Sequence, residues 1–105
     1  MIEKSLFIQA DIFEKTINAW GEKFQVLMAV EEMAELQKVL LKDANRNKKN
    51  LEEIIDETAD VIIMMQQIMH VYKIHDRVND KIAEKINRLK SRYDNWVSIQ
   101  NEAKK

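Results

Sequence analysis

Two pairs of acidic residues, each set among apolar residues, are the part of this sequence best suited to chemistry. Glu32 and Glu35 lie three residues apart, and so do Glu57 and Asp60. On a helix the members of each pair lie about 60° apart, on a face that also carries large apolar side chains. The carboxylates therefore interrupt surfaces that would otherwise be buried. Charge placed there is unfavourable unless protonation or a cation neutralises it.

Metal binding is the chemistry that this pattern favours. Two antiparallel helices joined by a short loop would bring the two pairs together. A like-charge pair about 4 Å apart costs about 4 kcal/mol at an effective dielectric of about 20. Carboxylate oxygens suit Mg²⁺, or Mn²⁺, better than zinc. The expected site therefore holds a divalent cation between the two helices.

Two other interpretations of the acidic residues compete with a magnesium site, and the sequence excludes the second of them. Glu-rich helices often present solvated faces, and a single Glu-x-x-Glu motif says little. A di-iron bundle would need Glu-x-x-His on two helices. Here His70 follows Gln67 and His75 follows Tyr72 at that spacing, so the di-iron motif is not formed.

The whole chain is predicted to be all-α, a bundle-like single domain spanning residues 1–105. Hydrophobic residues make up 46% and charged residues 33%, proline is absent and Gly21 is the only glycine, so helix breakers are scarce. The expected helices cover residues 2–18, 22–43, 51–73 and 76–99, and no strand is expected.

The expected helix ends rest on local signals. Gly21 favours a left-handed exit from the first helix. Asn50 is predicted to be an N-cap with Glu53 as its capping-box partner, and Asp76 is predicted to cap the last helix. Residues 43–49 are predicted to form a loop, and residues 100–105 a frayed tail.

Charge and composition indicate the cellular compartment and the classes of partner that the protein binds. There is no cysteine, no signal-peptide-like start and no apolar stretch of membrane-spanning length, so a cytoplasmic protein is expected. A net charge of -1 does not favour nucleic acid as a partner. Residues 31–72 carry nine acidic and five basic side chains, whereas residues 73–105 carry five acidic and nine basic ones.

The two helices with the acidic pairs have apolar residues on nearly all sides. A four-helix monomer of this size cannot cover both helices fully, so a homo-oligomer, either a dimer or a tetramer, is expected.

The last helix combines an apolar seam with a basic stripe. The seam consists of Ile82, Ile86, Leu89, Tyr93 and Trp96, and the stripe of Lys81, Lys85, Arg88 and Arg92. The basic side chains could bind phosphate groups, or they could form ion pairs with Asp80 and Glu84 on a solvated face.

From Trp20 to Tyr93 the chain resembles the MazG-like nucleotide pyrophosphohydrolases of the all-α NTP pyrophosphatase superfamily. The resemblance rests on Glu31-Glu32-x-x-Glu35 followed by Glu57-x-x-Asp60-Val61. It implies Mg²⁺-dependent hydrolysis between the α- and β-phosphates of a nucleoside triphosphate, which yields a monophosphate and pyrophosphate.

The resemblance also implies roles for individual residues. Glu32, Glu35, Glu57 and Asp60 would be the metal ligands. Glu31, Glu32 and Glu53 are the candidates to orient or deprotonate the attacking water. The candidates for substrate binding are Lys81, Lys85, Arg88, Arg92 and Trp20, the last by stacking on a base, although Trp20 could instead plug the turn before Gly21.

Two departures from the family pattern bear on the substrate. Relatives often have Asn where this chain has Leu89, and Tyr where it has Met64.

Two alternative functions remain. The chain could be a phosphoribosyl-ATP pyrophosphohydrolase of histidine biosynthesis, or a non-catalytic helical module that binds a basic protein partner.

Overall fold

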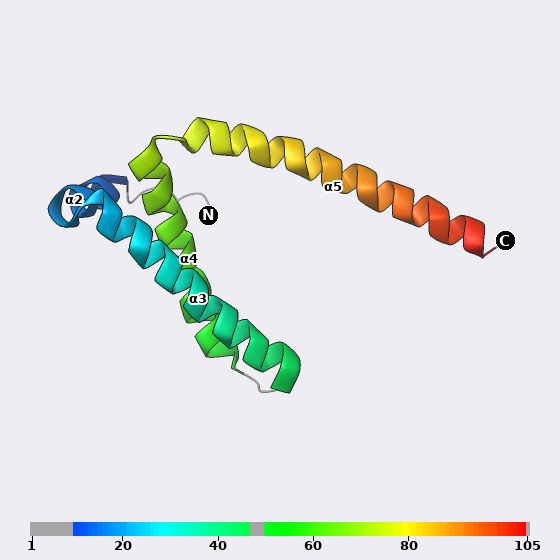
Figure 1. Ribbon diagram of the computed structural model, residues 1–105. Helices are drawn as coiled ribbons and strands as arrows, with labels where there is room; N and C mark the ends of the chain where they lie inside the picture. The colour runs from blue at the N-terminus through cyan, green and yellow to red at the C-terminus, as the bar shows by residue number, and fades with distance from the viewer. Residues whose placement is uncertain (1–9, 47–49, 105) are drawn as a thin grey trace. The chain divides into compact units, whose positions relative to one another are not determined.

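The protein is helical throughout the part of the chain that the structure describes. The computed structural model describes residues 10–46 and 50–104, which form four helices and no strand. These are α2 (Ala10–Trp20), α3 (Glu22–Arg46), α4 (Leu51–Tyr72) and α5 (His75–Ala103), shown in Figure 1. The predicted all-α class is confirmed.

Several helices run further than the sequence signals indicated. α2 continues to Trp20, past the expected end at Asn18, and α3 continues through Arg46 into the expected loop. α5 reaches Ala103, so the predicted frayed tail is wrong for residues 100–103. Gln, Glu and Ala at these positions are good helix formers, and nothing there stops the helix. The expected start near Ile2 and loop residues 47–49 lie outside the described residues.

Two residues with positive φ end helices. Gly21 has φ 96°, and its N–H donates to Ile17 O at 2.8 Å, which confirms the predicted glycine exit. Lys73 has φ 56°, and its N–H donates to Met69 O. The sequence does not predict a helix end at Lys73, because lysine rarely adopts the left-handed backbone conformation.

Asn50 occupies the predicted N-cap position of α4, but its side chain makes no capping hydrogen bond. The predicted capping box with Glu53 is therefore wrong. Instead Asn50 Nδ2 donates to Val39 O at 3.0 Å, which ties the start of α4 to α3. The predicted cap at Asp76 is also wrong, because α5 begins at His75 and Ile74 holds the cap position.

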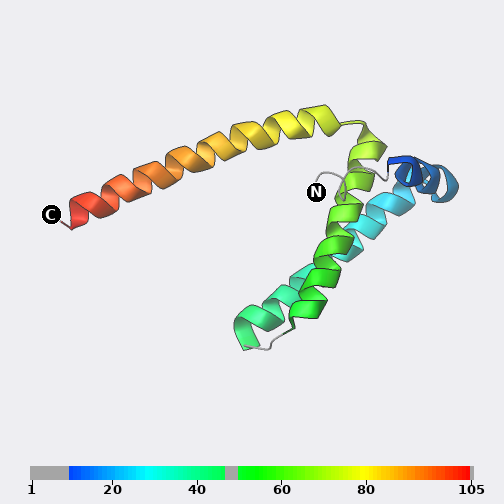
Figure 2. The same cartoon turned by 180° about the vertical axis from the view of Figure 1, so that it is seen from behind.

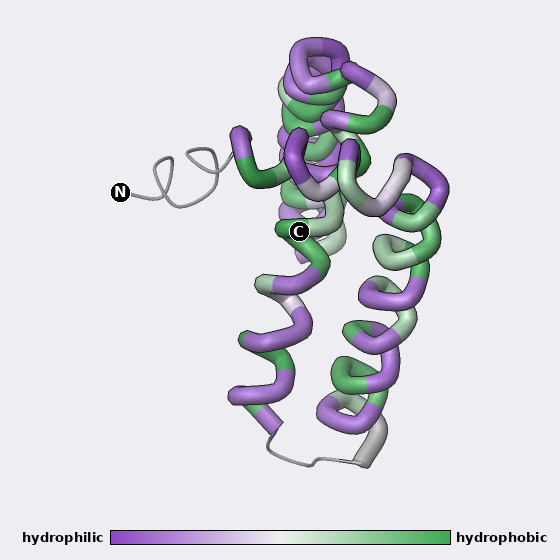
Figure 3. The backbone as a smooth tube through the Cα atoms, turned by 90° about the vertical axis from the view of Figure 1, so that its left-hand side faces the viewer, coloured by the Kyte–Doolittle hydropathy of each residue, from purple (hydrophilic) through white to green (hydrophobic). Residues whose placement is uncertain are grey.

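The chain divides into two compact units, Met1–Lys73 and Ile74–Lys105. In the first unit α3 and α4 lie side by side and antiparallel, as Figures 1 and 2 show, and α2 packs against both. Its buried apolar residues are few: Phe13, Ala29, Val39 and Met64. Hydrophilic and hydrophobic residues alternate along the helices, as Figure 3 shows.

Buried amides supplement this small core. Gln25, Gln66 and Gln67 are all buried. Gln67 Nε2 donates to Thr16 Oγ1 at 2.8 Å, and Thr16 Oγ1 donates to Phe13 O at 3.0 Å. The hydroxyl thus accepts one hydrogen bond and donates another, and the pair joins α4 to α2.

The second unit consists mainly of α5. None of its side chains is buried, and all five residues of the predicted apolar seam are exposed. Within the described residues, no helix is long and apolar enough to cross a membrane.

Candidate metal centre

Three of the predicted metal ligands converge between α3 and α4. Glu32 of α3 and Glu57 and Asp60 of α4 each offer a carboxylate oxygen, and these oxygens lie within 4.8 Å of one another. All three side chains are half-buried. We call this cluster the acidic triad. It forms because the antiparallel hairpin places the inward face of α3 against the inward face of α4, as the sequence predicted.

One oxygen of the acidic triad has no partner to satisfy it. Glu57 Oε2 is buried and accepts no hydrogen bond from the described residues. A buried carboxylate oxygen that accepts no hydrogen bond destabilises the folded state. A proton on the neighbouring Glu32 or a bound cation would satisfy it.

The negative charges around Glu32 also favour a proton or a cation at the acidic triad. Partial burial raises the pKa of the Glu32 carboxyl above its ordinary value of 4.5, and the negative charges of Asp60 and Glu57 raise it further. Hydrogen bonds to those two carboxylates, for which Glu32 must hold the proton, act in the same direction. Without a cation, Glu32 therefore keeps its proton to a higher pH than a free glutamate does.

The acidic triad could hold a cation after some rearrangement. Neighbouring oxygens on an octahedral Mg²⁺ are about 3 Å apart, because each lies about 2.1 Å from the ion. The three carboxylate oxygens, which lie within 4.8 Å of one another, would have to move closer together to share one ion. Among the described residues that form the cluster, every ligand is a carboxylate, which suits magnesium or manganese and not zinc.

The fourth predicted ligand, Glu35, lies outside the acidic triad. Its carboxylate is exposed, with Oε1 3.6 Å from Lys38 Nζ, one turn further along α3. Exposed pairs of this kind contribute little to stability, so the contact can be exchanged for another partner. Glu35 as a metal ligand stays a prediction.

Of the three residues predicted to orient or deprotonate the attacking water, one belongs to the acidic triad and two do not. Glu32 is in the acidic triad, whereas Glu31 and Glu53 are exposed and do not belong to it. Glu31 lies about 100° around α3 from Glu32, which turns it away from α4. Roles for Glu31 and Glu53 in the reaction remain predictions.

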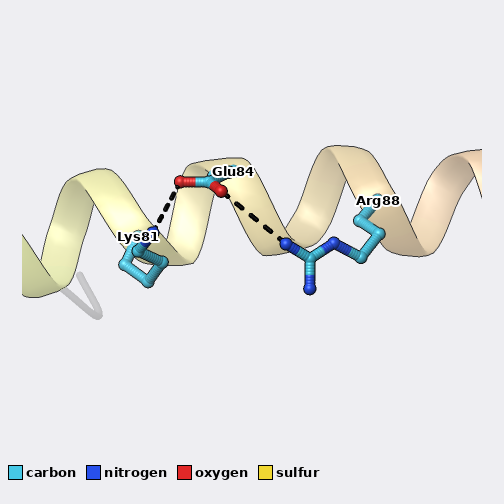
Figure 4. Close-up of polar contacts among 3 residues, drawn as sticks. All are labelled: Lys81, Glu84 and Arg88. Carbon is cyan, nitrogen blue, oxygen red and sulfur yellow. Dashed lines mark hydrogen bonds and ion pairs between the residues drawn. The ribbon is translucent and has the colours of Figure 1, made fainter.

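The basic stripe lies on α5, in the second unit. Lys81 Nζ is 2.9 Å from Glu84 Oε2, and Arg88 Nη2 is 3.7 Å from Glu84 Oε1, as Figure 4 shows. Lys85 and Arg92 are exposed on the same helix. The ion pairs with Glu84 match the solvated-face interpretation for Lys81 and Arg88, while phosphate binding by the stripe stays a prediction.

Trp20 stands at the turn between α2 and α3. Its ring meets Phe24 edge-on, with centroids 6.1 Å apart, and both rings line an open apolar hollow with Ala19. Trp20 is 62% exposed, so an aromatic surface is available to a ligand. Base stacking on Trp20 stays a prediction.

The sequence analysis did not single out the buried amides. In the sequence, Gln66 and Gln67 lie among the apolar residues of α4, and this position could have indicated that they are buried.

Comparison with protein-family models, with curated proteins and with solved structures found no match for this chain.

Proposed function

We propose that this chain is a Mg²⁺-dependent nucleoside triphosphate pyrophosphohydrolase of the MazG-like kind, acting in the cytoplasmic nucleotide pool as a homo-oligomer. The observation that carries the proposal is the convergence of Glu32, Glu57 and Asp60. The motif resemblance supplies the reaction, and the acidic triad supplies a place where a cation would be bound.

Each residue of the triad has a defined part in this proposal. Glu57 and Asp60 hold the cation from α4, and Glu32 joins them from α3 once it loses its proton. A bound magnesium ion neutralises phosphate charge and lowers the pKa of a coordinated water. Glu35, one turn from Glu32, completes the carboxylate set in place of its contact with Lys38.

The reaction is a direct hydrolysis. Water attacks the α-phosphorus, the bond from that phosphorus to the oxygen bridging the α- and β-phosphates breaks, and a carboxylate near the triad accepts the proton of the water. Pyrophosphate leaves, and the nucleoside monophosphate retains the new oxygen. No covalent enzyme intermediate is proposed.

The direct test is pyrophosphate release from a panel of deoxynucleoside and ribonucleoside triphosphates, with Mg²⁺ and with EDTA. We expect turnover with Mg²⁺ and none with EDTA. Asp60→Asn should lower kcat by at least about 100-fold, because a neutral amide holds the cation poorly. Asp56→Asn, at an exposed acidic position on the same helix, is the matched control and should retain activity.

Adding phosphoribosyl-ATP to this panel separates the alternatives. Turnover of phosphoribosyl-ATP alone would assign the histidine-biosynthesis reaction instead. If no nucleotide is hydrolysed and Mg²⁺ leaves the melting temperature unchanged, the acidic face is a protein-docking surface and the proposal fails, because a ligand that binds the native state must stabilise it.

A further inference from the structure

Two buried side-chain amides of the first unit each have a polar atom without a partner. Gln25 of α3 and Gln67 of α4 are only 3% and 6% exposed. Gln25 Nε2, a donor, and Gln67 Oε1, an acceptor, are buried and make no hydrogen bond with any described residue. A buried amide atom in this state destabilises the fold, so a partner for each atom would stabilise it.

The packing of α3 on α4 places these two amides opposite each other. The acidic triad sets the register, because Glu32 of α3 lies against Glu57 and Asp60 of α4. Gln25 precedes Glu32 by seven residues, and Gln67 follows Asp60 by seven. Seven residues make about two helical turns, so in this antiparallel pair both glutamines lie on the inner faces, about 10.5 Å along the helices from the acidic triad.

Contacts with α2 determine which end of the Gln67 amide has no partner. Gln67 Nε2 donates to Thr16 Oγ1 at 2.8 Å, and this hydroxyl donates its only proton to Phe13 O at 3.0 Å. Because that proton is already used, Thr16 can only accept a hydrogen bond from Gln67. The Nε2 end of the amide therefore faces α2, and Oε1 is the end that remains for α3.

We infer that one internal water molecule binds between Gln25 Nε2 and Gln67 Oε1. Water accepts a hydrogen bond from an amide N–H and donates one to an amide oxygen, so a single molecule matches both atoms. Internal waters of folded proteins occupy such sites, between buried polar groups that otherwise have no partner. The water oxygen is expected about 2.7–3.2 Å from each atom.

This water completes a chain of hydrogen bonds through three helices. The chain starts at Phe13 O in α2, passes through Thr16 and Gln67, and ends at Gln25 in α3. It uses no atom of the acidic triad, so the inference stands apart from the proposed enzymatic function. Its effect is to tie α2 to both helices that carry the triad.

NMR of protein labelled with ¹⁵N in its glutamine side chains tests the inference. The Gln25 amide protons should show a nuclear Overhauser effect to water, with the sign of a molecule that tumbles with the protein. Coupling through a hydrogen bond between Gln25 Nε2 and the Gln67 side-chain carbonyl carbon should be absent, because water separates the two groups. Absence of the Overhauser effect, an effect that arises only from exchange with bulk water, or detection of the coupling would overturn the inference.

A matched pair of variants tests the assigned acceptor. Gln67→Met removes Oε1 and keeps a side chain of similar length, so the water signal at Gln25 should be lost. Gln66→Met is the control, because Gln66 is also buried on α4 but has no atom among the unpartnered ones, and this variant should keep the signal. A folded Gln67→Met protein with the full signal would overturn the inference, and the wild-type spectra decide it even if a variant does not fold.

Discussion

At the scale of single residues, the acidic triad is where sequence and structure agree most closely. Glu32, Glu57 and Asp60 were predicted to converge, and their carboxylate oxygens lie within 4.8 Å of one another. Glu35, from the same three-residue spacing, instead lies beside Lys38. Spacing alone does not explain the difference, because Glu57 and Asp60 have the same three-residue spacing on α4 and both belong to the acidic triad. Glu35 differs in its neighbour, since its carboxylate is exposed and lies 3.6 Å from Lys38 Nζ on the same helix.

Glu32 should make the stability of the metal-free protein depend on pH. Its pKa is raised above 4.5 in the folded state, so the native state binds more protons than the unfolded state between 4.5 and that raised value. The free energy of unfolding should therefore fall as the pH rises through this interval. Urea unfolding in EDTA should show wild type losing stability relative to Glu32→Gln. Parallel pH profiles for the two proteins would contradict the shift.

Removing one charge of the acidic triad should stabilise the protein when no metal is bound. Asp60→Asn relieves like-charge repulsion, and about 1 kcal/mol of relief would raise Tm by roughly 4–8 °C. Thermal melts in EDTA measure this change. Asp56→Asn is again the control and should leave Tm nearly unchanged. Added Mg²⁺ should stabilise wild type and leave Asp60→Asn almost unaffected.

At the scale of helices, the inner faces were predictable and the ends were less so. The hydrophobic period placed α3 and α4 against each other, and Gly21 marked the exit from α2 as expected. Asn50 shows why caps are harder to predict. An asparagine can satisfy the first turn of its own helix or bond to another segment, and here it bonds to Val39 O. Which bond forms depends on the neighbouring helix.

Gly21 should be sensitive to any side chain. At φ 96° an L-residue is strained, and a Cβ added there meets no atom within 4 Å, so the cost comes from the backbone alone. Gly21→Ala should cost about 1–2 kcal/mol of unfolding free energy. Gly21→Asn should cost less, because asparagine tolerates left-handed conformations better. Chemical denaturation of both variants measures the difference. Equal losses would indicate that backbone strain is not the cause.

The hydrogen bond between Gln67 and Thr16 should contribute measurably to the free energy of unfolding, because the Gln67 side chain is buried. Thr16→Val keeps the shape of the side chain but leaves the buried Gln67 amide without the acceptor for its N–H. The expected cost is about 1–3 kcal/mol. Thr16→Ser retains the hydroxyl and should lose less. A valine variant as stable as wild type would show that the amide finds another partner.

At the scale of the whole molecule, each of the two units has few or no buried apolar side chains of its own among the described residues. Phe13, Ala29, Val39 and Met64 are buried in the first unit, and α5 has no buried residue. The homo-oligomer expected from the sequence stays a prediction.

Association should appear directly in the melting behaviour. If folding and dimerisation are linked, Tm should rise with total protein concentration, because mass action favours the associated native state. Calorimetry or circular dichroism over a hundredfold range of concentration would detect the rise. A wild-type Tm independent of concentration would contradict the linkage.

The sequence by itself determined the all-α class, the approximate helix positions and three acidic residues of one site. Those features follow from composition and from the period of a helix, which act locally. Tertiary structure alone decided that Asn50 bonds to Val39 across the hairpin and that the buried Gln67 joins α4 to α2. Both bonds depend on what a second helix places opposite a side chain, and a one-dimensional pattern does not contain that information.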